Sequence, residues 1–152
     1  MLQLLLAGGP GSGKSTSYHR LYGAQAPNQG NVLTDDTSLA DREKAHGYIG
    51  AALGTGRAVE ISFVYRPFQL AFAGMVERAI VDGRYLTIER MLDAHAGARS
   101  TILDVDRRFA GDLADKRLSI RVLDNSLSRR GDGARRRVPP LQHLPYFTGR
   151  PQ

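Results

Sequence analysis

The sequence predicts an α/β fold, in which a sheet of four parallel strands carries helices on both of its faces. Short apolar runs, which suit buried strands, alternate with longer stretches of helical pattern along the chain. No tight-turn signal joins one strand to the next, so the strands must be connected by crossovers and lie parallel. At 152 residues, the chain has the size of one domain with its own core.

The first half of the chain contains two predicted strands and two predicted helices. Residues 2–7 (LQLLLA) are apolar enough for a strand that is buried on both faces. A glycine-rich segment then leads into STSYHRLY, a helix that meets neither Pro nor Gly until Gly23. Residues 30–35 (GNVLTD) are typical of a short strand that ends in acids, and residues 38–53 carry a helical pattern.

The second half continues this alternation. Residues 57–66 (RAVEISFVYR) are rich in β-branched and aromatic side chains, as strands are. Pro67 suits the first turn of the next helix, PFQLAFAGMVERAIV, which ends before Gly83. A long charged helix is expected over residues 87–112, and residues 118–124 (LSIRVLD) are the last predicted strand.

The order of these strands in the sheet follows from the handedness of their connections. Right-handed crossovers restrict the possible arrangements. We expect the strand at residues 2–7 to lie inside the sheet, with the strand at 30–35 on one side of it. The strand at 57–66 is expected on the other side, followed by the strand at 118–124.

A phosphate-binding loop follows the first predicted strand. Gly8, Gly13, Lys14 and Ser15 fit the P-loop pattern G-x-x-x-x-G-K-[ST], and a strand and a helix flank it as that motif requires. The glycines let successive N–H groups form a nest for anions, which the start of the helix also favours. The expected nucleotide-binding residues are Gly8, Gly9, Pro10, Gly11, Ser12, Gly13, Lys14, Ser15 and Thr16.

The loop implies ATP and Mg²⁺ as its ligands. Lys14 supplies a point charge for the β- and γ-phosphates, and the Ser15 hydroxyl is a ligand for Mg²⁺. The fold class is therefore that of the P-loop NTPases. Residues 1–127 are expected to form a P-loop kinase-like domain, and residues 128–152 an Arg- and Pro-rich tail that is no separate domain.

Polar residues follow the other predicted strands as well. Ligands of such sheets bind outside the carboxyl ends of the strands, so these residues are expected to gather at one edge. The residues expected at this edge, besides the P-loop, are Asp35, Asp36, Tyr65, Arg66, Asp124, Asn125 and Ser126.

The two aspartates are the candidate acids of the site. An acid beside a P-loop strand holds the Mg²⁺ shell or takes the proton of an attacking hydroxyl. We expect Asp35 to fill both the catalytic and the metal-binding role. The alternative is a plain strand-to-helix turn in which Asp36 or Thr37 caps the following helix.

Arginines are the candidate partners of the transferred phosphoryl group. Phosphoryl transfer needs positive charge there and the exclusion of water. Arg78, Arg84 and Arg90 lie where the helix after Pro67 passes into the long charged helix, although single helix arginines are often merely solvated. His95 has no second histidine at ligand spacing, so we assign no metal to it.

Composition narrows the class of protein. The chain has no cysteine, which excludes disulfides and thiolate metal sites. No apolar run approaches membrane-spanning length and the start lacks the basic region of a signal peptide, so we expect a cytoplasmic protein. The net charge is +6, and residues 129–137 (RRGDGARRR) carry much of it; this segment is either a solvated tail or a contact for nucleic acid.

Several segments, in this order, resemble the zeta-toxin-like P-loop kinases. They are AGGPGSGKST, NVLTDDTSL, VEISFVYRPFQLAFAGMVERAI, GR, AHAGA and RVLDNS, within residues 2–126. Zeta toxins use ATP and Mg²⁺ to phosphorylate UDP-N-acetyl sugars, which blocks cell-wall synthesis. The resemblance implies that Lys14 and Ser15 bind ATP and Mg²⁺, that Arg78 and Arg84 grip phosphate, and that an antitoxin protein is a possible partner.

The chain departs from the longer zeta toxins after its first helix. Those proteins have a further strand and helix there, which carry their catalytic aspartate, whereas here only GAQAPNQG separates Tyr22 from Asn31. That base is then missing from this chain, unless Asp35 or Asp36 replaces it. Two other readings stay open: a non-catalytic or regulatory nucleotide-binding module, and a nucleic-acid-associated NTPase that uses the Arg-rich tail.

Overall fold

The computed structural model of the chain describes residues 1–22 and 32–126. The Arg-rich tail and the segment between the first helix and the second strand lie outside these residues, so the interpretations placed on them stay predictions. The elements, in chain order, are β1 (Leu2–Ala7), α1 (Lys14–Tyr22), β2 (Val32–Asp36), α2 (Arg42–Gly54), β3 (Ala58–Tyr65), α3 (Phe68–Asp82), α4 (Ile88–Arg108), α5 (Ala110–Ala114) and β4 (Leu118–Asp124).

The four strands form one parallel sheet in the order β2-β1-β3-β4. This confirms the expected order, with the strand that leads into the P-loop inside the sheet. β1 is buried along almost its whole length because it has a neighbour on each side and helices above and below. The P-loop therefore follows the most deeply buried strand of the sheet.

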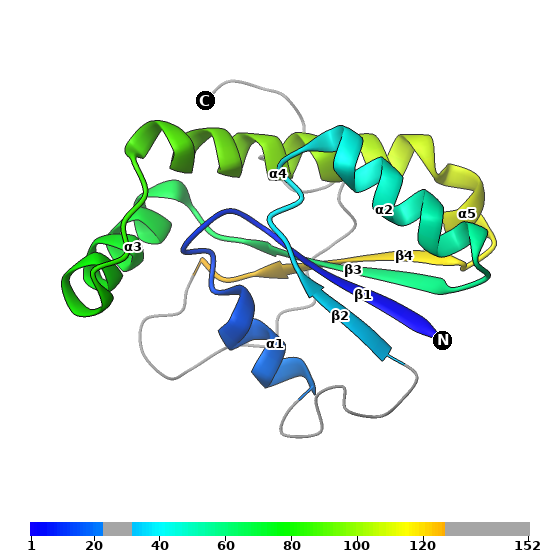
Figure 1. The fold of residues 1–152 in the computed structure, drawn as a ribbon, viewed down its shortest axis with the longest axis horizontal. Coiled ribbons are helices and arrows are strands. Elements are labelled where there is room, and N and C mark those ends of the chain that lie inside the picture. Colours follow the sequence, from blue (N-terminus) through cyan, green and yellow to red (C-terminus); the bar gives the residue numbers. More distant parts are fainter. Residues whose placement is uncertain (23–31, 127–152) are drawn as a thin grey trace.

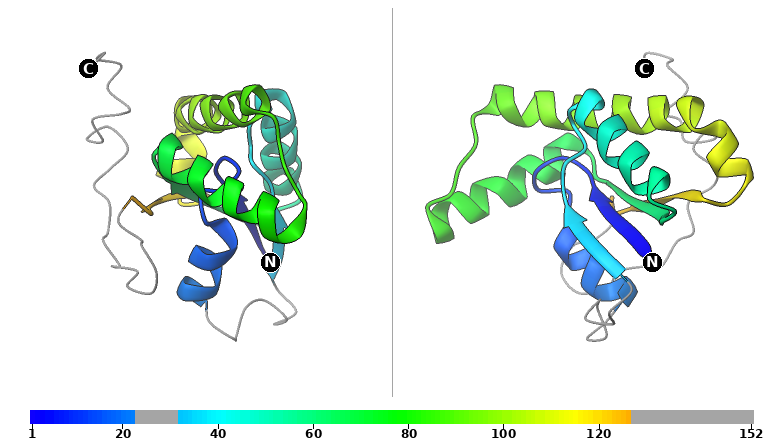
Figure 2. Two further views of the ribbon diagram at one scale, coloured as in Figure 1. Left: turned by 90° about the vertical axis from the view of Figure 1, so that its left-hand side faces the viewer. Right: turned by 45° about the vertical axis from the view of Figure 1, so that its right-hand side comes forward.

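Helices cover both faces of the sheet, as the sequence predicted. Figure 1 shows α2, α4 and α5 on one face and α1 on the other, while α3 lies at the end of the sheet that carries the loops. The side views in Figure 2 show the same layers. The main core lies between the sheet and the α2–α4 layer, and its fully buried members include Leu5, Ile49, Ile61, Ile102, Val105 and Leu118.

The other face of the sheet is more polar. α1 has no buried residue, and beneath it the central strand β3 carries Glu60. The Tyr22 hydroxyl donates to Glu60 Oε1 at 2.7 Å, and Arg121 Nη2 lies 3.4 Å from the same oxygen. Burial and the bond to this carboxylate raise the pKa of Tyr22 to about 12. The last residue of α1 is thus tied to the sheet by a hydrogen bond.

Two helix boundaries differ from the predictions. The helix expected from residue 38 begins at Arg42, with Asp41 as its N-cap, so neither Asp36 nor Thr37 caps it. Thr37 and Ser38 each accept a hydrogen bond from the N–H two residues on, which competes with helix formation. The expected helix over 87–112 is two helices, α4 and α5, with a break at Phe109.

None of the helices among the described residues is long and apolar enough to span a bilayer.

Candidate active site

The loop between β1 and α1 has the backbone of an anion-binding nest. Gly8, Gly11 and Gly13 take φ angles of 134°, 74° and 88°, which side chains with a Cβ rarely adopt. Lys14 begins α1, and its Nζ donates to the carbonyl of Gly8 at 2.9 Å, so the ammonium folds back across the loop. The positive φ angles are those that the glycines of the motif allow.

Neighbouring elements leave no room for side chains along this loop. A Cβ on Gly9 would lie 2.3 Å from the ring of His95 on α4, although no unusual φ angle is recorded for Gly9. A Cβ on Gly11 would lie 2.4 Å from the carbonyl oxygen of Ala71 on α3. The glycines therefore serve close packing as well as backbone conformation.

Side chains from three other parts of the chain bind backbone carbonyls of the loop. Nε2 of His95 lies 2.7 Å from the carbonyl oxygen of Pro10. Nη1 of Arg66, just after β3, donates to the carbonyl of Gly11 at 3.1 Å. Nδ2 of Asn125, just after β4, donates to the carbonyl of Ser12 at 2.8 Å. Three successive carbonyls thus each have a side-chain partner.

A hollow of about 190 Å³ opens beside the loop and the start of α1. Its lining combines backbone of the loop, three hydroxyls, one acid and three cations. The lining residues are Gly11, Ser12, Gly13, Lys14, Ser15, Thr16, Asp36, Arg66, Gly74 and Arg78. Most of the predicted nucleotide-binding residues therefore come together around one space.

The hollow is strongly positive. Lys14, Arg66 and Arg78 face a single carboxylate, Asp36, whose Oδ1 lies 3.9 Å from Lys14 Nζ. Burial lowers the pKa of Lys14, Asp36 partly opposes this, and the nearby Arg78 lowers it further. Cations crowded together in this way are stabilised by an anion placed among them.

Asp35 and Asp36 lie on opposite faces of the sheet, because successive residues of a strand alternate. Asp35 is level with Leu5, and its carboxylate accepts a hydrogen bond from Gln3 Nε2 at 2.5 Å. Asp36 is level with Leu6 and lines the hollow. The structure thus brings Asp36, and not the expected Asp35, to the P-loop.

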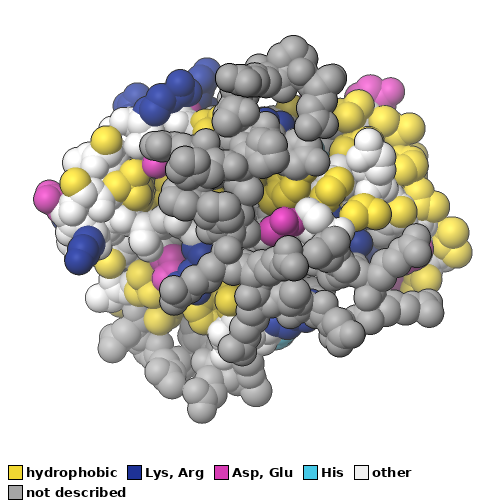
Figure 3. Space-filling model, turned by 180° about the vertical axis from the view of Figure 1, so that it is seen from behind, with side chains coloured by type: hydrophobic (Ala, Val, Ile, Leu, Met, Phe, Trp, Pro, Cys, Tyr) yellow, Lys and Arg dark blue, Asp and Glu magenta, His cyan; other side chains and the backbone are white. Residues whose placement is uncertain are grey.

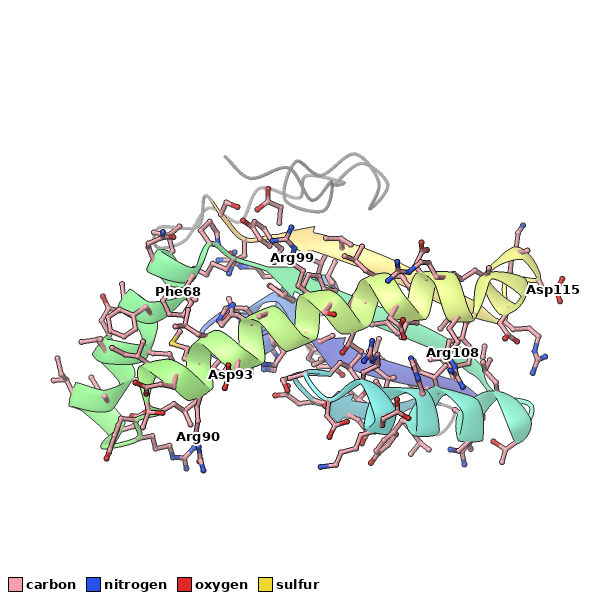
Figure 4. The ribbon with its side chains drawn as sticks, turned by 90° about the horizontal axis from the view of Figure 1, so that it is seen from above. Phe68, Arg90, Asp93, Arg99, Arg108 and Asp115 are labelled. Atoms are coloured by element: carbon pink, nitrogen blue, oxygen red, sulfur yellow. The ribbon has the colours of Figure 1, made fainter. Side chains whose placement is uncertain are left out.

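Of the three candidate arginines, only one lines the hollow. Arg78 on α3 lines the hollow, while Arg84 is exposed in the turn between α3 and α4 and is not part of the lining. Arg90 lies at the start of α4 and points away from the fold (Figure 4). Exposed apolar side chains surround this turn and gather at one end of the molecule in Figure 3; they include Val76, Ile80, Val81, Tyr85, Leu86, Ile88 and Leu92.

Sequence reasoning gave no role to three residues that touch the loop. Arg66 and Asn125 were placed at the correct edge by the rule for strand ends, but nothing local showed that they bind loop carbonyls. His95 lies in the middle of α4, 85 residues from Pro10, and no spacing pattern links the two. Among the described residues, no group of three His, Cys, Asp or Glu side chains is arranged to hold a metal by itself.

Comparisons with known proteins agree with the fold. A model of the zeta toxin family matches residues 24–132, more than half of the chain. The match begins after the P-loop, so the two observations are independent. A crystal structure of AvrRxo1-ORF1:AvrRxo1-ORF2 with sulphate ions is similar in fold, with a TM-score of 0.65 and 14% identity, covering 82% of this chain and 55% of that one. No curated protein matches the chain.

Proposed function

Because the chain belongs to the zeta-toxin family, we propose that it is a kinase that transfers the γ-phosphoryl group of ATP to a hydroxyl group of a small acceptor. The observation that carries the proposal is the hollow, in which the P-loop meets Lys14, Arg66, Arg78 and Asp36. A passive nucleotide site needs the loop and the lysine. The added arginine and carboxylate are the groups that phosphoryl transfer requires.

The residues of the hollow fit the phosphates of ATP. Side chains bind the carbonyls of Pro10, Gly11 and Ser12. The N–H of Ser12 donates to the carbonyl of Gly9 at 3.2 Å, while those of Gly11 and Gly13 can bind an anion. Ser12 Oγ and Arg66 Nε are buried and have no hydrogen-bond partner among the described residues. Buried donors without partners are costly, and phosphate oxygens can accept from both.

The same lining fits Mg²⁺, which prefers hard oxygen ligands. The Ser15 hydroxyl, at the first turn of α1, would hold the ion together with phosphate oxygens of the nucleotide. The bound ion supplies positive charge that neutralises the phosphates. This assignment replaces the expectation that Asp35 is a metal ligand, since Asp35 is bonded to Gln3 on the other face of the sheet.

The protein's own groups then have separate tasks. Lys14 and the N–H groups of the loop orient the β- and γ-phosphates. The acceptor oxygen forms a bond to Pγ while the bond from Pγ to the β-phosphate oxygen breaks and ADP leaves. Asp36 takes the proton of the acceptor hydroxyl, and Arg78 neutralises charge that develops on the γ-phosphoryl group.

Family membership suggests a UDP-N-acetyl sugar as the acceptor. Family membership also suggests Arg84 as a second phosphate-binding arginine, although it does not line the hollow. AvrRxo1-ORF1 was crystallised with AvrRxo1-ORF2, which supports a protein partner, such as an antitoxin, for this chain too. A kinase of this kind works in the cytoplasm, where ATP is present.

The test is a mass-spectrometric screen of the purified chain with ATP, Mg²⁺ and a panel of hydroxyl compounds that includes UDP-N-acetylglucosamine. We expect one compound to gain the mass of a phosphoryl group, and Lys14→Ala to abolish the gain. Tight ATP binding without transfer to any compound or to water would instead establish a non-catalytic nucleotide-binding module.

A further inference from the structure

The outer face of the P-loop has a regular feature that the transfer reaction does not explain. The carbonyls of Pro10, Gly11 and Ser12 are consecutive, and each is bound by one side chain from a different element. His95 comes from α4, Arg66 from the end of β3 and Asn125 from the end of β4. A carbonyl that is fixed in place turns the N–H of the same peptide unit toward the opposite side, because the peptide is planar and trans. The Pro10 and Ser12 carbonyls orient the N–H groups of Gly11 and Gly13 in this way, whereas the N–H of Ser12 donates to the carbonyl of Gly9.

We propose that His95 is a positioning residue of the phosphate site, which fixes the Pro10 carbonyl and so aims the N–H of Gly11 at the nucleotide phosphates. Asn125 does the same for the N–H of Gly13 through the Ser12 carbonyl, and Arg66 holds the Gly11 carbonyl between them. We call these three side chains the carbonyl clamp. His95 is its informative member, because it does not line the hollow and so acts only through the loop. Arg66 does line the hollow, so its removal would change both the charge of the hollow and the contact with the Gly11 carbonyl.

The surroundings of His95 suit a fixed neutral donor. Its ring packs edge-on against Phe68 at the start of α3, with centroids 5.7 Å apart, and rests where a Cβ of Gly9 would be. A carbonyl oxygen accepts, so Nε2 carries a proton. Burial lowers the pKa of His95, the Pro10 carbonyl opposes this, and the Lys14 charge lowers it further. At neutral pH we therefore expect the Nε2–H tautomer.

The first experiment needs no variant and no nucleotide. Nitrogen-15 NMR of the imidazoles at pH 7.5 should show His95 as the Nε2–H tautomer, with a cross-hydrogen-bond coupling or contact to the Pro10 carbonyl. A His95 ring in the Nδ1–H tautomer cannot donate from Nε2 and would overturn the proposal. This readout does not depend on catalysis, so it stands apart from the proposed function.

The second experiment compares the two histidines that contact other elements from a helix. His95→Ala should weaken binding of Mg·ATP about three- to tenfold in calorimetry, the effect of one lost hydrogen bond. His95→Gln, whose amide N–H can reach the same carbonyl, should recover part of this loss. His46→Ala removes a contact of 2.7 Å to Asp104 between α2 and α4, far from the loop, and should leave the affinity unchanged.

The controls separate stability from positioning. Exchange of the loop amides with solvent should become faster in His95→Ala and stay as in the wild type in His46→Ala. Equal losses of affinity in both variants would show a general effect on the fold and overturn the role of His95. A wild-type chain that binds no ATP would overturn the proposed function alone, and the tautomer and amide exchange would still decide the role of His95.

The third experiment tests the packing between His95 and Gly9. Gly9→Ala places a Cβ 2.3 Å from the His95 ring, so it should displace the ring from Pro10 and weaken Mg·ATP binding at least as much as His95→Ala does. In the double variant Gly9→Ala/His95→Ala the ring is absent, so the second change should add little to the first. If the double variant instead loses affinity by the product of the two single losses, Gly9 and His95 act independently and the proposal is overturned.

Discussion

The carboxylate of Asp36 lies 3.9 Å from the ammonium group of Lys14, at the point where the second strand ends beside the P-loop. Its chain neighbour Asp35 is bonded to Gln3 on the opposite face of the sheet. Two adjacent acids, which look equivalent in the sequence, are thereby divided between a site and a structural contact. Substitutions of Asp36 and Asp35 can therefore be compared directly.

Asp36→Asn should lower the rate of phosphoryl transfer by about 10²- to 10⁴-fold, the usual contribution of a general base. ATP affinity should change little, because the amide keeps the shape of the side chain. Asp35→Asn should leave the rate within about twofold and instead lower the free energy of unfolding by about 1 kcal/mol, through its weakened bond to Gln3.

Steady-state kinetics and urea unfolding of both variants check this prediction. If Asp36→Asn mainly weakens the binding of Mg·ATP, then Asp36 holds the metal shell and is not the base. A large loss of rate in Asp35→Asn, with Asp36→Asn active, would restore the original expectation for Asp35.

Lys14 should contribute to ATP binding at the expense of stability. Lys14→Met should weaken Mg·ATP binding by about 1.5–3 kcal/mol, the range for hydrogen bonds to charged groups. Burial lowers the pKa of Lys14, which means that the folded protein disfavours its charge. The free energy of unfolding of the ATP-free variant should therefore not fall below that of the wild type.

Calorimetry and thermal unfolding with and without ATP measure both effects. The wild type should gain stability from ATP by mass action, and Lys14→Met should gain little at the same concentration. A variant with wild-type affinity would remove Lys14 from the phosphate site.

The arginines separate a kinase from a passive binding site. Arg78 lines the hollow, so Arg78→Ala should cut turnover by about 10³-fold or more, as the loss of an arginine finger does, while ATP affinity changes little. Arg84→Ala should have a smaller effect, because Arg84 lies in the α3–α4 turn and does not line the hollow. A larger effect of Arg84→Ala would show that the turn closes over the nucleotide. Equal losses of affinity and turnover would make Arg78 a ground-state contact.

The features that the sequence predicted best are those with a local cause. The order of the strands and the P-loop follow from alternating patterns, short connections and a fixed spacing of glycines. The face of the second strand on which each aspartate lies depends on register with β1, and VLTDD contains no sign of it. Asp36 lies on the side of the hollow only because it is level with Leu6.

The contact between His95 and the P-loop could not be predicted from the sequence at all. It depends on where α4 crosses the sheet, and α4 is placed by its buried residues against α2 and the sheet. No pattern within α4 distinguishes His95 from a solvated helix histidine. The need for a glycine at position 9 could not be predicted either. It follows from the ring of His95, which occupies the place of a Cβ on Gly9.

The last prediction concerns the α1 face of the sheet, where Tyr22 has a pKa raised to about 12 by burial and by its bond to Glu60. Unfolded tyrosine titrates near 10, so between about pH 10 and 12 the unfolded chain has lost a proton that the folded chain keeps. The contribution of Tyr22 to stability is therefore complete below about pH 10 and is lost as the pH rises toward 12. Because Tyr22 is only half-buried, solvent screening limits this contribution to about 1 kcal/mol.

Urea unfolding at pH 8, 10, 11 and 12 tests this prediction. The alkaline loss of stability that Tyr22 causes should appear in the wild type and in Tyr48→Phe, which changes an exposed tyrosine, but not in Tyr22→Phe. An equally steep alkaline loss in Tyr22→Phe would show that other groups cause it.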